Sequence, residues 1–95
     1  MATRHAVVRH AEGLHARPAE MIAREAIRHV AQVTLVHGSR RVDAKSILDV
    51  LTLGAVQGAE LIVEAAGDDE EAAAQSVATL IESDFVSHNN TTEGG

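Results

Sequence analysis

The 95-residue sequence contains no cysteine, tryptophan or tyrosine, and only one phenylalanine and one proline. Without cysteine, the chain forms no disulfide, no zinc–thiolate site and no thiol nucleophile. With a single aromatic side chain of the Phe, Tyr and Trp type, it lacks stacking platforms for bases, so we expect no nucleic-acid partner. No apolar run reaches the length of a membrane span, and the N-terminus lacks a signal-peptide core. We therefore expect a cytoplasmic protein that does not insert into membranes.

The rest of the composition fits one small domain. Hydrophobic residues make up 45% of the chain, enough for one core within residues 1–85. From Val86 onward the chain is polar and ends in two glycines, so we expect residues 86–95 to form a disordered tail. All eight Lys and Arg residues lie at or before Lys45, whereas ten of the 14 acidic residues follow it. This asymmetry predicts a basic surface that orients charged partners.

Residues 13–19, Gly-Leu-His-Ala-Arg-Pro-Ala, carry the strongest chemical signal. Pro18 is tolerated only in the first turn of a helix, which places His15 at or near the helix N-cap. Free backbone amides, the helix dipole and Arg17 then form a site suited to a doubly charged anion such as phosphate. The same positive surroundings favour a neutral, nucleophilic imidazole, which predicts a phosphohistidine at His15. The alternative is an ordinary surface histidine that serves as a helix cap.

Hydrophobic spacing predicts a helix from residue 16 to about residue 29. Its apolar stripe includes Ile22 and continues through Ile27 and Val30. The opposite face carries Met21, which we expect to be exposed. Glu20 and Arg24 lie on the same face at a favourable i, i+4 spacing for an ion pair.

Strands are expected at residues 4–10, 33–36, 40–43 and 60–66, with further helices from residue 47 to 53 and from the acidic residues 68–71 to about residue 81. His5 and His10 differ in parity on the first strand, so they point to opposite faces. Acidic residues 68–71 begin the last helix, where its dipole favours negative charge, and we assign them no metal. The order strand, helix, strand, strand, helix, strand, helix predicts an α+β fold with the helices on one sheet face.

The short helix after residue 46 is apolar nearly all round. Ser46, with Asp49 three residues later, has the pattern of a helix cap. Because one short helix cannot bury every side, we expect some of Ile47, Leu48 and Leu51 to stay exposed as a docking patch. A regulatory role for Ser46 remains open beside the capping role.

The motif around His15, followed by Asp-Ala-Lys-Ser-Ile-Leu at residues 43–48 and by Gly54 and Gly58, resembles the HPr family of histidine-containing phosphocarriers of the bacterial sugar phosphotransferase system. The resemblance covers residues 3 to about 85. It implies an open-faced β-sandwich with a four-stranded antiparallel sheet. It also implies that His15 accepts a phosphoryl group on Nδ1 from phospho-enzyme I and donates it to a histidine of enzyme IIA.

The resemblance also implies particular residue roles. The Arg17 side chain and the amides of Ala16 and Arg17 would hold the phosphoryl oxygens, with no metal or other cofactor. Met21, Arg24 and the helix after Ser46 would contact partners. In some bacteria a kinase/phosphorylase acts on the HPr serine that corresponds to Ser46. We expect a monomer.

Glu12 and Asp49 depart from residues common in the family, and we expect them, together with Glu20, to weaken partner binding or phosphohistidine stability. These departures favour an alternative within the family, a nitrogen-related regulatory carrier without sugar transport. A second alternative is a non-catalytic regulatory module that binds through Ile47, Leu48 and Leu51. A third is a metal-binding protein that uses some of the six histidines, although no histidine pair has ligand-like spacing on a helix.

Overall fold

The computed structural model describes residues 1–83. Its elements confirm the predicted order of strands and helices. The strands are β1 (Ala2–Val7), β2 (Gln32–His37), β3 (Arg40–Asp43) and β4 (Glu60–Ala66), and the helices are α1 (Ala16–Ile27), α2 (Ile47–Thr52) and α3 (Glu70–Glu82). The predicted tail lies outside the described residues.

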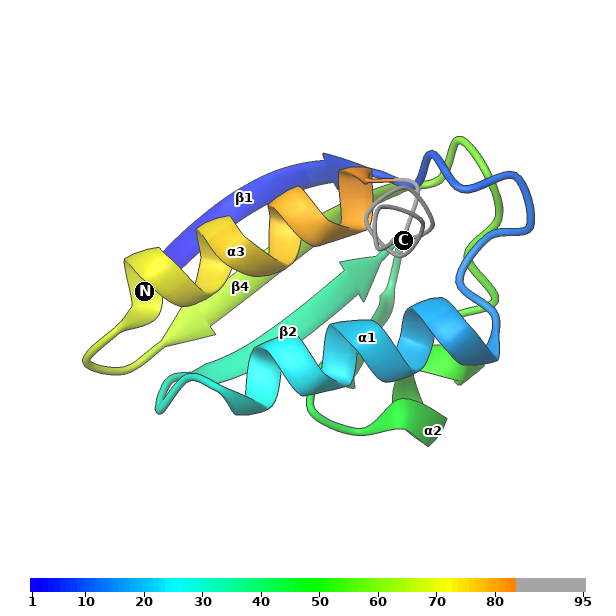
Figure 1. The fold of residues 1–95 in the computed structure, drawn as a ribbon. Helices are drawn as coiled ribbons and strands as arrows, with labels where there is room; N and C mark the ends of the chain where they lie inside the picture. Colours follow the sequence, from blue (N-terminus) through cyan, green and yellow to red (C-terminus); the bar gives the residue numbers. More distant parts are fainter. Residues whose placement is uncertain (84–95) are drawn as a thin grey trace, which may run out of the picture.

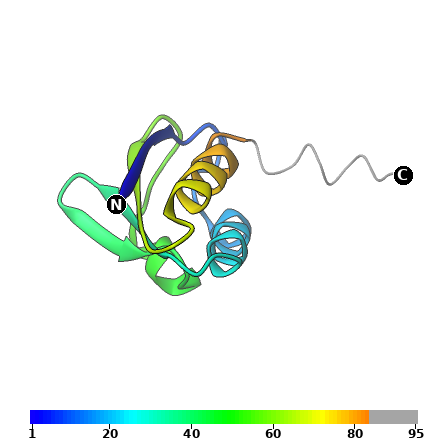
Figure 2. The ribbon, with the colours of Figure 1, turned by 90° about the vertical axis from the view of Figure 1, so that its left-hand side faces the viewer.

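The strands form one antiparallel sheet in the order β1-β4-β2-β3. Figure 1 shows α1 and α3 running side by side across the sheet, and the turned view in Figure 2 shows both on the same face. The shorter α2 packs against α1 and near β3. The predicted open-faced α+β sandwich is therefore confirmed.

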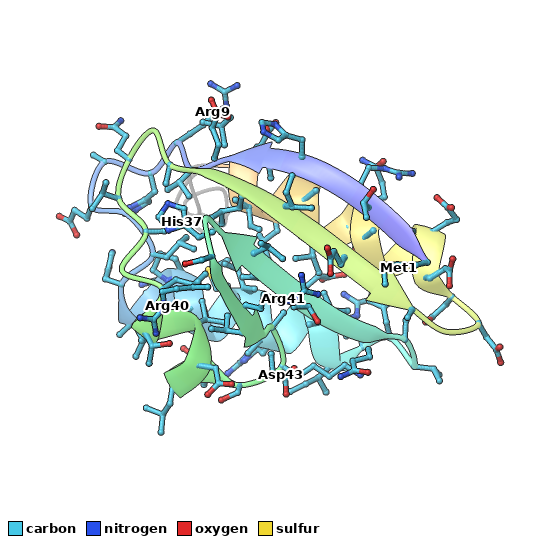
Figure 3. All side chains as sticks on the ribbon, turned by 180° about the vertical axis from the view of Figure 1, so that it is seen from behind. Met1, Arg9, His37, Arg40, Arg41 and Asp43 are labelled. Atoms are coloured by element: carbon cyan, nitrogen blue, oxygen red, sulfur yellow. The ribbon has the colours of Figure 1, made fainter. Side chains whose placement is uncertain are left out.

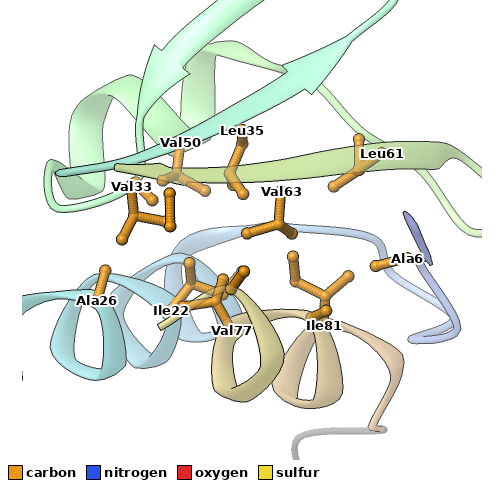
Figure 4. Packing of buried hydrophobic residues seen from close by; sticks show 14 of the residues in the cluster. Ala6, Ile22, Ala26, Val33, Leu35, Val50, Leu61, Val63, Val77 and Ile81 are labelled. Atoms are coloured by element: carbon orange, nitrogen blue, oxygen red, sulfur yellow. The ribbon is translucent and has the colours of Figure 1, made fainter. Parts of the chain in front are cut away.

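The core lies between the sheet and the two long helices. Alternate residues of the central strands point toward the helices, and the helical stripes meet them, as Figure 4 shows. Fully buried members are Val33, Leu35, Leu61 and Val63 from the sheet, and Ile22, Val77 and Ile81 from the helices. Each such side chain contributes about 1.5–3 kcal/mol relative to an exposed position.

The opposite sheet face is polar at its rim, and among residues 1–83 no helix covers it (Figure 3). Arg41 of β3 forms an ion pair with Glu64 of β4. His5 of β1 contacts Glu60 of β4, with 3.3 Å between Nε2 and Oε1. This face is solvated, as expected of an antiparallel sheet with helices on one side.

The predicted first strand, residues 4–10, is wrong at both ends. The β1–β4 register begins at Ala2 and stops where Val7 meets Glu60, the first residue of β4. Beyond that pair, Val8 still bonds to the loop residue Ala59, but the partner strand has ended. His10 therefore lies in a loop rather than on a strand face.

The predicted helix over residues 16–29 ends earlier, at Ile27, which is itself 60% exposed. Val30 lies after the helix and is 81% exposed, so the stripe does not extend to either residue. The carbonyl of His29 accepts a hydrogen bond from Lys45 Nζ at 2.9 Å, and the amide of Val30 donates to Asp69 at 3.0 Å. These tertiary partners turn the chain away from the helix and into β2.

The expectation that Met21 is exposed is also wrong. Met21 is partly buried against the core, and it lines a groove together with Leu80 of α3. Leu51 of α2 is likewise partly buried against the core. Met21 lies outside the apolar stripe of its own helix, yet it packs against the core beside the groove that Leu80 also lines.

Candidate functional site

His15 is the N-cap residue of α1, as the position of Pro18 predicted. Its backbone is extended, with φ −86° and ψ −163°, and its carbonyl accepts the first intrahelical hydrogen bond, from the amide of Ala19 at 2.9 Å. The imidazole makes no capping hydrogen bond and is 43% exposed. The alternative in which the ring serves as a helix cap is therefore wrong, and the ring faces solvent at the start of the helix.

The start of α1 presents hydrogen-bond donors beside this ring. Because the first intrahelical bond is donated by Ala19, the amides of Ala16 and Arg17 have no acceptor within the helix. Pro18, at the third helical position, has no amide hydrogen to leave unpaired. The exposed Arg17 side chain adds a permanent positive charge to the same turn. Together these groups suit an oxyanion with several acceptor oxygens.

A glycine fixes how the chain enters this site. Gly13 has φ 72°, and its amide donates to the carbonyl of His10 at 2.9 Å. The next amide, of Leu14, donates to the carbonyl of Ala55 at 3.0 Å, which joins the loop before α1 to the loop after α2 (Figure 1). A Cβ at position 13 would lie 2.5 Å from that carbonyl oxygen. The close approach of the two loops therefore requires glycine here.

Two further side chains approach His15 from the same loop. Glu12 Oε1 lies 3.3 Å from His15 Nε2. The ring of His10 lies beside the ring of His15, with centroids 5.3 Å apart and planes tilted by 49°. His10 Nδ1 accepts a hydrogen bond from the backbone amide of Glu12 at 3.2 Å. The sequence analysis did not identify His10 as a neighbour of His15, because it placed His10 on a strand. Gly13 was the available signal, since a glycine there indicates a turn that brings the chain back toward His10.

A groove runs between α1 and α3 next to the His15 turn. It is lined by Ala16, Arg17, Glu20, Met21, Arg24, Glu25, Arg28 and Leu80. Glu20 accepts a hydrogen bond from Arg24 at 2.9 Å, which confirms the predicted ion pair. Three arginines and two glutamates line this groove, and Arg24 and Arg28 are paired with Glu20 and Glu25, so only Arg17 adds a charge without a paired glutamate in the lining.

The predicted docking residues divide into two groups. Ile47 and Leu48 of α2 are exposed, Leu48 by 73%, so the expected apolar surface on this helix is present. Leu51, by contrast, turns toward the core. Met21 and Arg24 belong to the groove instead, and only Arg24 is exposed there.

Ser46 is the N-cap of α2, and its Oγ accepts a hydrogen bond from the amide of Asp49 at 3.2 Å. The predicted capping role is therefore confirmed. The preceding turn is closed by Asp43, whose carbonyl accepts from the amide of Ser46 at 3.1 Å. Its side chain accepts from the amide of Lys45 at 2.9 Å.

Within residues 1–83, no cluster of three or more histidine, aspartate and glutamate side chains has an arrangement that could hold a metal ion. In the same part of the chain, every helix is too short or too polar to cross a bilayer.

Comparison with known proteins places these features in a family context. The family model described as the PTS HPr component phosphorylation site matches residues 2–83. The phosphocarrier protein HPr of Borreliella burgdorferi is 35% identical over 83 residues, covering 87% of this chain and 96% of the relative. That of Treponema pallidum is 40% identical over 73 residues, covering 77% and 83%. The crystal structure of HPr-C-His from Thermoanaerobacter tengcongensis superposes with a TM-score of 0.84 at 36% identity, covering 90% and 96% of the two chains.

Proposed function

Because this chain belongs to the HPr family of phosphocarrier proteins of the phosphotransferase system, we propose that His15 is the residue that carries the phosphoryl group. One observation supports this assignment above all. The imidazole of His15 makes no capping hydrogen bond. It lies at the N-terminus of α1, beside the amides of Ala16 and Arg17 and the Arg17 guanidinium. A nucleophile and donors for phosphoryl oxygens thus occur in one helical turn.

The reaction in this proposal is a transfer between histidines. His15 Nδ1 attacks the phosphorus of phospho-enzyme I, itself charged by phosphoenolpyruvate. The new N–P bond forms as the bond to the donor histidine breaks, and the electron pair stays on the donor nitrogen. The reverse chemistry then delivers the group to a histidine of enzyme IIA. Catalysis is alignment and charge stabilisation, and it needs neither metal nor cofactor on this domain.

Docking of both partners would use the surfaces around the site. Ile47 and Leu48 offer exposed apolar area on α2, and the partly buried Leu51 lies on the same helix. Met21 and Arg24 contribute from the groove, where arginine favours an acidic partner. In this proposal the protein works as a cytoplasmic monomer that meets enzyme I and enzyme IIA in turn, in sugar uptake or its regulation. The alternative within the family is a nitrogen-related regulatory carrier that takes no part in sugar transport.

Ser46 is a second candidate phosphorylation site. A phosphate there would stand at the N-terminus of α2, where the helix dipole favours it, but it would oppose docking of acidic or apolar partner surfaces. An HPr kinase/phosphorylase is the corresponding partner. Incubation with such a kinase and ATP, with Ser46→Ala as control, should give an acid-stable phosphoryl group on the wild type alone.

The experiment that tests the His15 assignment is intact-mass measurement after incubation with phosphoenolpyruvate and enzyme I. The wild type should gain one phosphoryl group that acid removes, and His15→Ala should gain none. Acid lability separates phosphohistidine from phosphoserine. No adduct with several enzymes I, including that of the source organism, would overturn the proposal and favour the non-catalytic binding module. Measuring phosphoryl transfer from the phosphorylated protein to a sugar-type and to a nitrogen-type enzyme IIA would distinguish the sugar-transport role from the nitrogen-related role.

A further inference from the structure

The carboxylate of Glu12 approaches the His15 ring on its Nε2 side. Its Oε1 lies 3.3 Å from Nε2, the ring nitrogen that the proposed transfer does not use. The contact is local, because three residues separate the two side chains in the chain. It therefore lies within one loop and needs no side chain from a distant element.

The charge of this carboxylate influences which nitrogen carries the ring proton. A carboxylate oxygen 3.3 Å from Nε2 repels a lone pair on that nitrogen and attracts a hydrogen, so the contact favours a hydrogen on Nε2. In the neutral ring the lone pair is then on Nδ1. Free histidine in water populates both neutral tautomers, whereas a carboxylate beside one nitrogen favours the form that carries hydrogen there.

From this geometry we propose that Glu12 is a positioning residue that holds His15 in the Nε2–H tautomer and thereby leaves Nδ1 as the phosphoryl acceptor. The inference rests on the proposed function of His15. It gives a positive role to a residue that, from the sequence, is expected only to weaken the site.

The same contact acts after transfer. When the N–P bond forms at Nδ1, the ring keeps its Nε2 hydrogen and becomes cationic, so its contact with the Glu12 carboxylate becomes an ion pair. When the group leaves for an acceptor, the N–P electrons return to Nδ1 and a neutral imidazole departs. No proton has to move in either step. The carboxylate therefore supports acceptance and donation alike.

His10 supports this arrangement through the backbone. Its Nδ1 accepts the amide hydrogen of Glu12 at 3.2 Å, and its carbonyl accepts the amide of Gly13 at 2.9 Å. These two bonds fold the loop so that the Glu12 side chain reaches His15. An asparagine at position 10 would keep an acceptor in nearly the same place as Nδ1, as in an Asx turn, whereas alanine would not.

The first test measures the tautomer of His15 directly, without any partner protein. In ¹⁵N NMR spectra recorded where the His15 ring is neutral, the wild type should show the Nε2–H form almost alone. Glu12→Ala should shift the ring toward the mixture seen in free histidine. His10→Ala should shift it in the same direction, and His10→Asn should restore most of the wild-type state. Asp68→Asn, which removes an exposed charge elsewhere, is the matched control and should leave the ring unchanged.

The second test measures phosphoryl transfer with phosphoenolpyruvate and enzyme I. Because the Glu12 carboxylate is 76% exposed, its effect should be modest, roughly a two- to fivefold slower phosphorylation in Glu12→Ala. Glu12→Asp should recover part of the rate if its shorter side chain restores the Nε2–H form. An unchanged tautomer in Glu12→Ala would overturn the positioning role. A shifted tautomer without any phosphorylation of the wild type would instead overturn the proposed function, while the contact itself stands.

Discussion

The amide of Leu14 donates a hydrogen bond to the carbonyl of Ala55 at 3.0 Å, and this bond presses the loop before α1 against the loop after α2. Gly13 lies at the point of contact with a left-handed φ of 72°. Because His15 follows two residues later, the packing of these loops sets where its ring and the contacting Glu12 stand. The position of the site therefore depends on Gly13, because a side chain there would keep the two loops apart.

Substitution of Gly13 by alanine should destabilise the protein for two reasons. The left-handed backbone alone costs a non-glycine residue about 1–2 kcal/mol. In addition, the new Cβ would lie 2.5 Å from the carbonyl oxygen of Ala55, which adds roughly 1–3 kcal/mol of strain. Gly38→Ala is the matched control, because Gly38 has φ 62° and nothing within 4 Å of its added Cβ. Urea denaturation should show a larger loss for Gly13→Ala; equal losses would contradict the clash.

Loss of the Ser46 cap should weaken α2 measurably. Ser46→Ala removes the acceptor for the amide of Asp49, which typically costs about 0.5–2 kcal/mol of folding free energy. Ser46→Asp keeps an acceptor oxygen and should retain most of the stability. Ser39→Ala, in the exposed turn between β2 and β3, serves as the control and should have little effect. If Ser46→Ala unfolds at the same denaturant concentration as the wild type, the cap contributes nothing.

Local chemistry made much of this structure predictable. The stripe through Ile22 identified the buried face of α1, and alternation identified the buried residues of β4. Pro18 fixed the start of α1, and Ser46 fixed the start of α2. Each of these signals acts within a few residues along the chain, where the sequence states the spacing directly.

What the sequence did not reveal depends on contacts between distant elements. Met21 is covered because α3 brings Leu80 to the same groove. His10 reaches the ring of His15 because the β1–β4 register ends early and the chain turns back. Both outcomes follow from tertiary packing that no helix or strand period encodes. The site was therefore predicted at His15 but not in its neighbours.

The corrected end of the α1 stripe can be tested with two isoleucines of the same helix. Ile22 is fully buried, so Ile22→Ala should lower the free energy of unfolding by about 2–5 kcal/mol. Ile27 is 60% exposed, so Ile27→Ala should change it by no more than about 0.5 kcal/mol. Thermal or urea unfolding of both variants measures the difference. A large loss in Ile27→Ala would mean that the stripe continues into the core after all.

The N-cap residue of α3, Asp69, ties that helix to the end of α1. Its carboxylate accepts from the amide of Ala31 at 2.8 Å and from the amide of Val30 at 3.0 Å, and it lies 3.2 Å from His29 Nδ1. The hydrogen bond from Ala31, followed by those from Val30 and His29, holds the pKa of Asp69 below its ordinary value. The folded state therefore favours the ionised carboxylate more than the unfolded state does.

This lowered pKa gives stability a defined dependence on acid. The contribution of Asp69 is fully present above the ordinary carboxyl pKa of about 4, and it disappears as the pH falls through the lower pKa of the folded state. Asp69→Asn cannot titrate, so it should be less stable than the wild type at pH 7. Its free energy of unfolding should also fall less steeply below about pH 4. Asp68→Asn, a neighbouring exposed substitution, should keep the wild-type slope. Urea unfolding at a series of pH values measures all three proteins, and identical acid slopes for Asp69→Asn and the wild type would show that these hydrogen bonds do not depend on the charge.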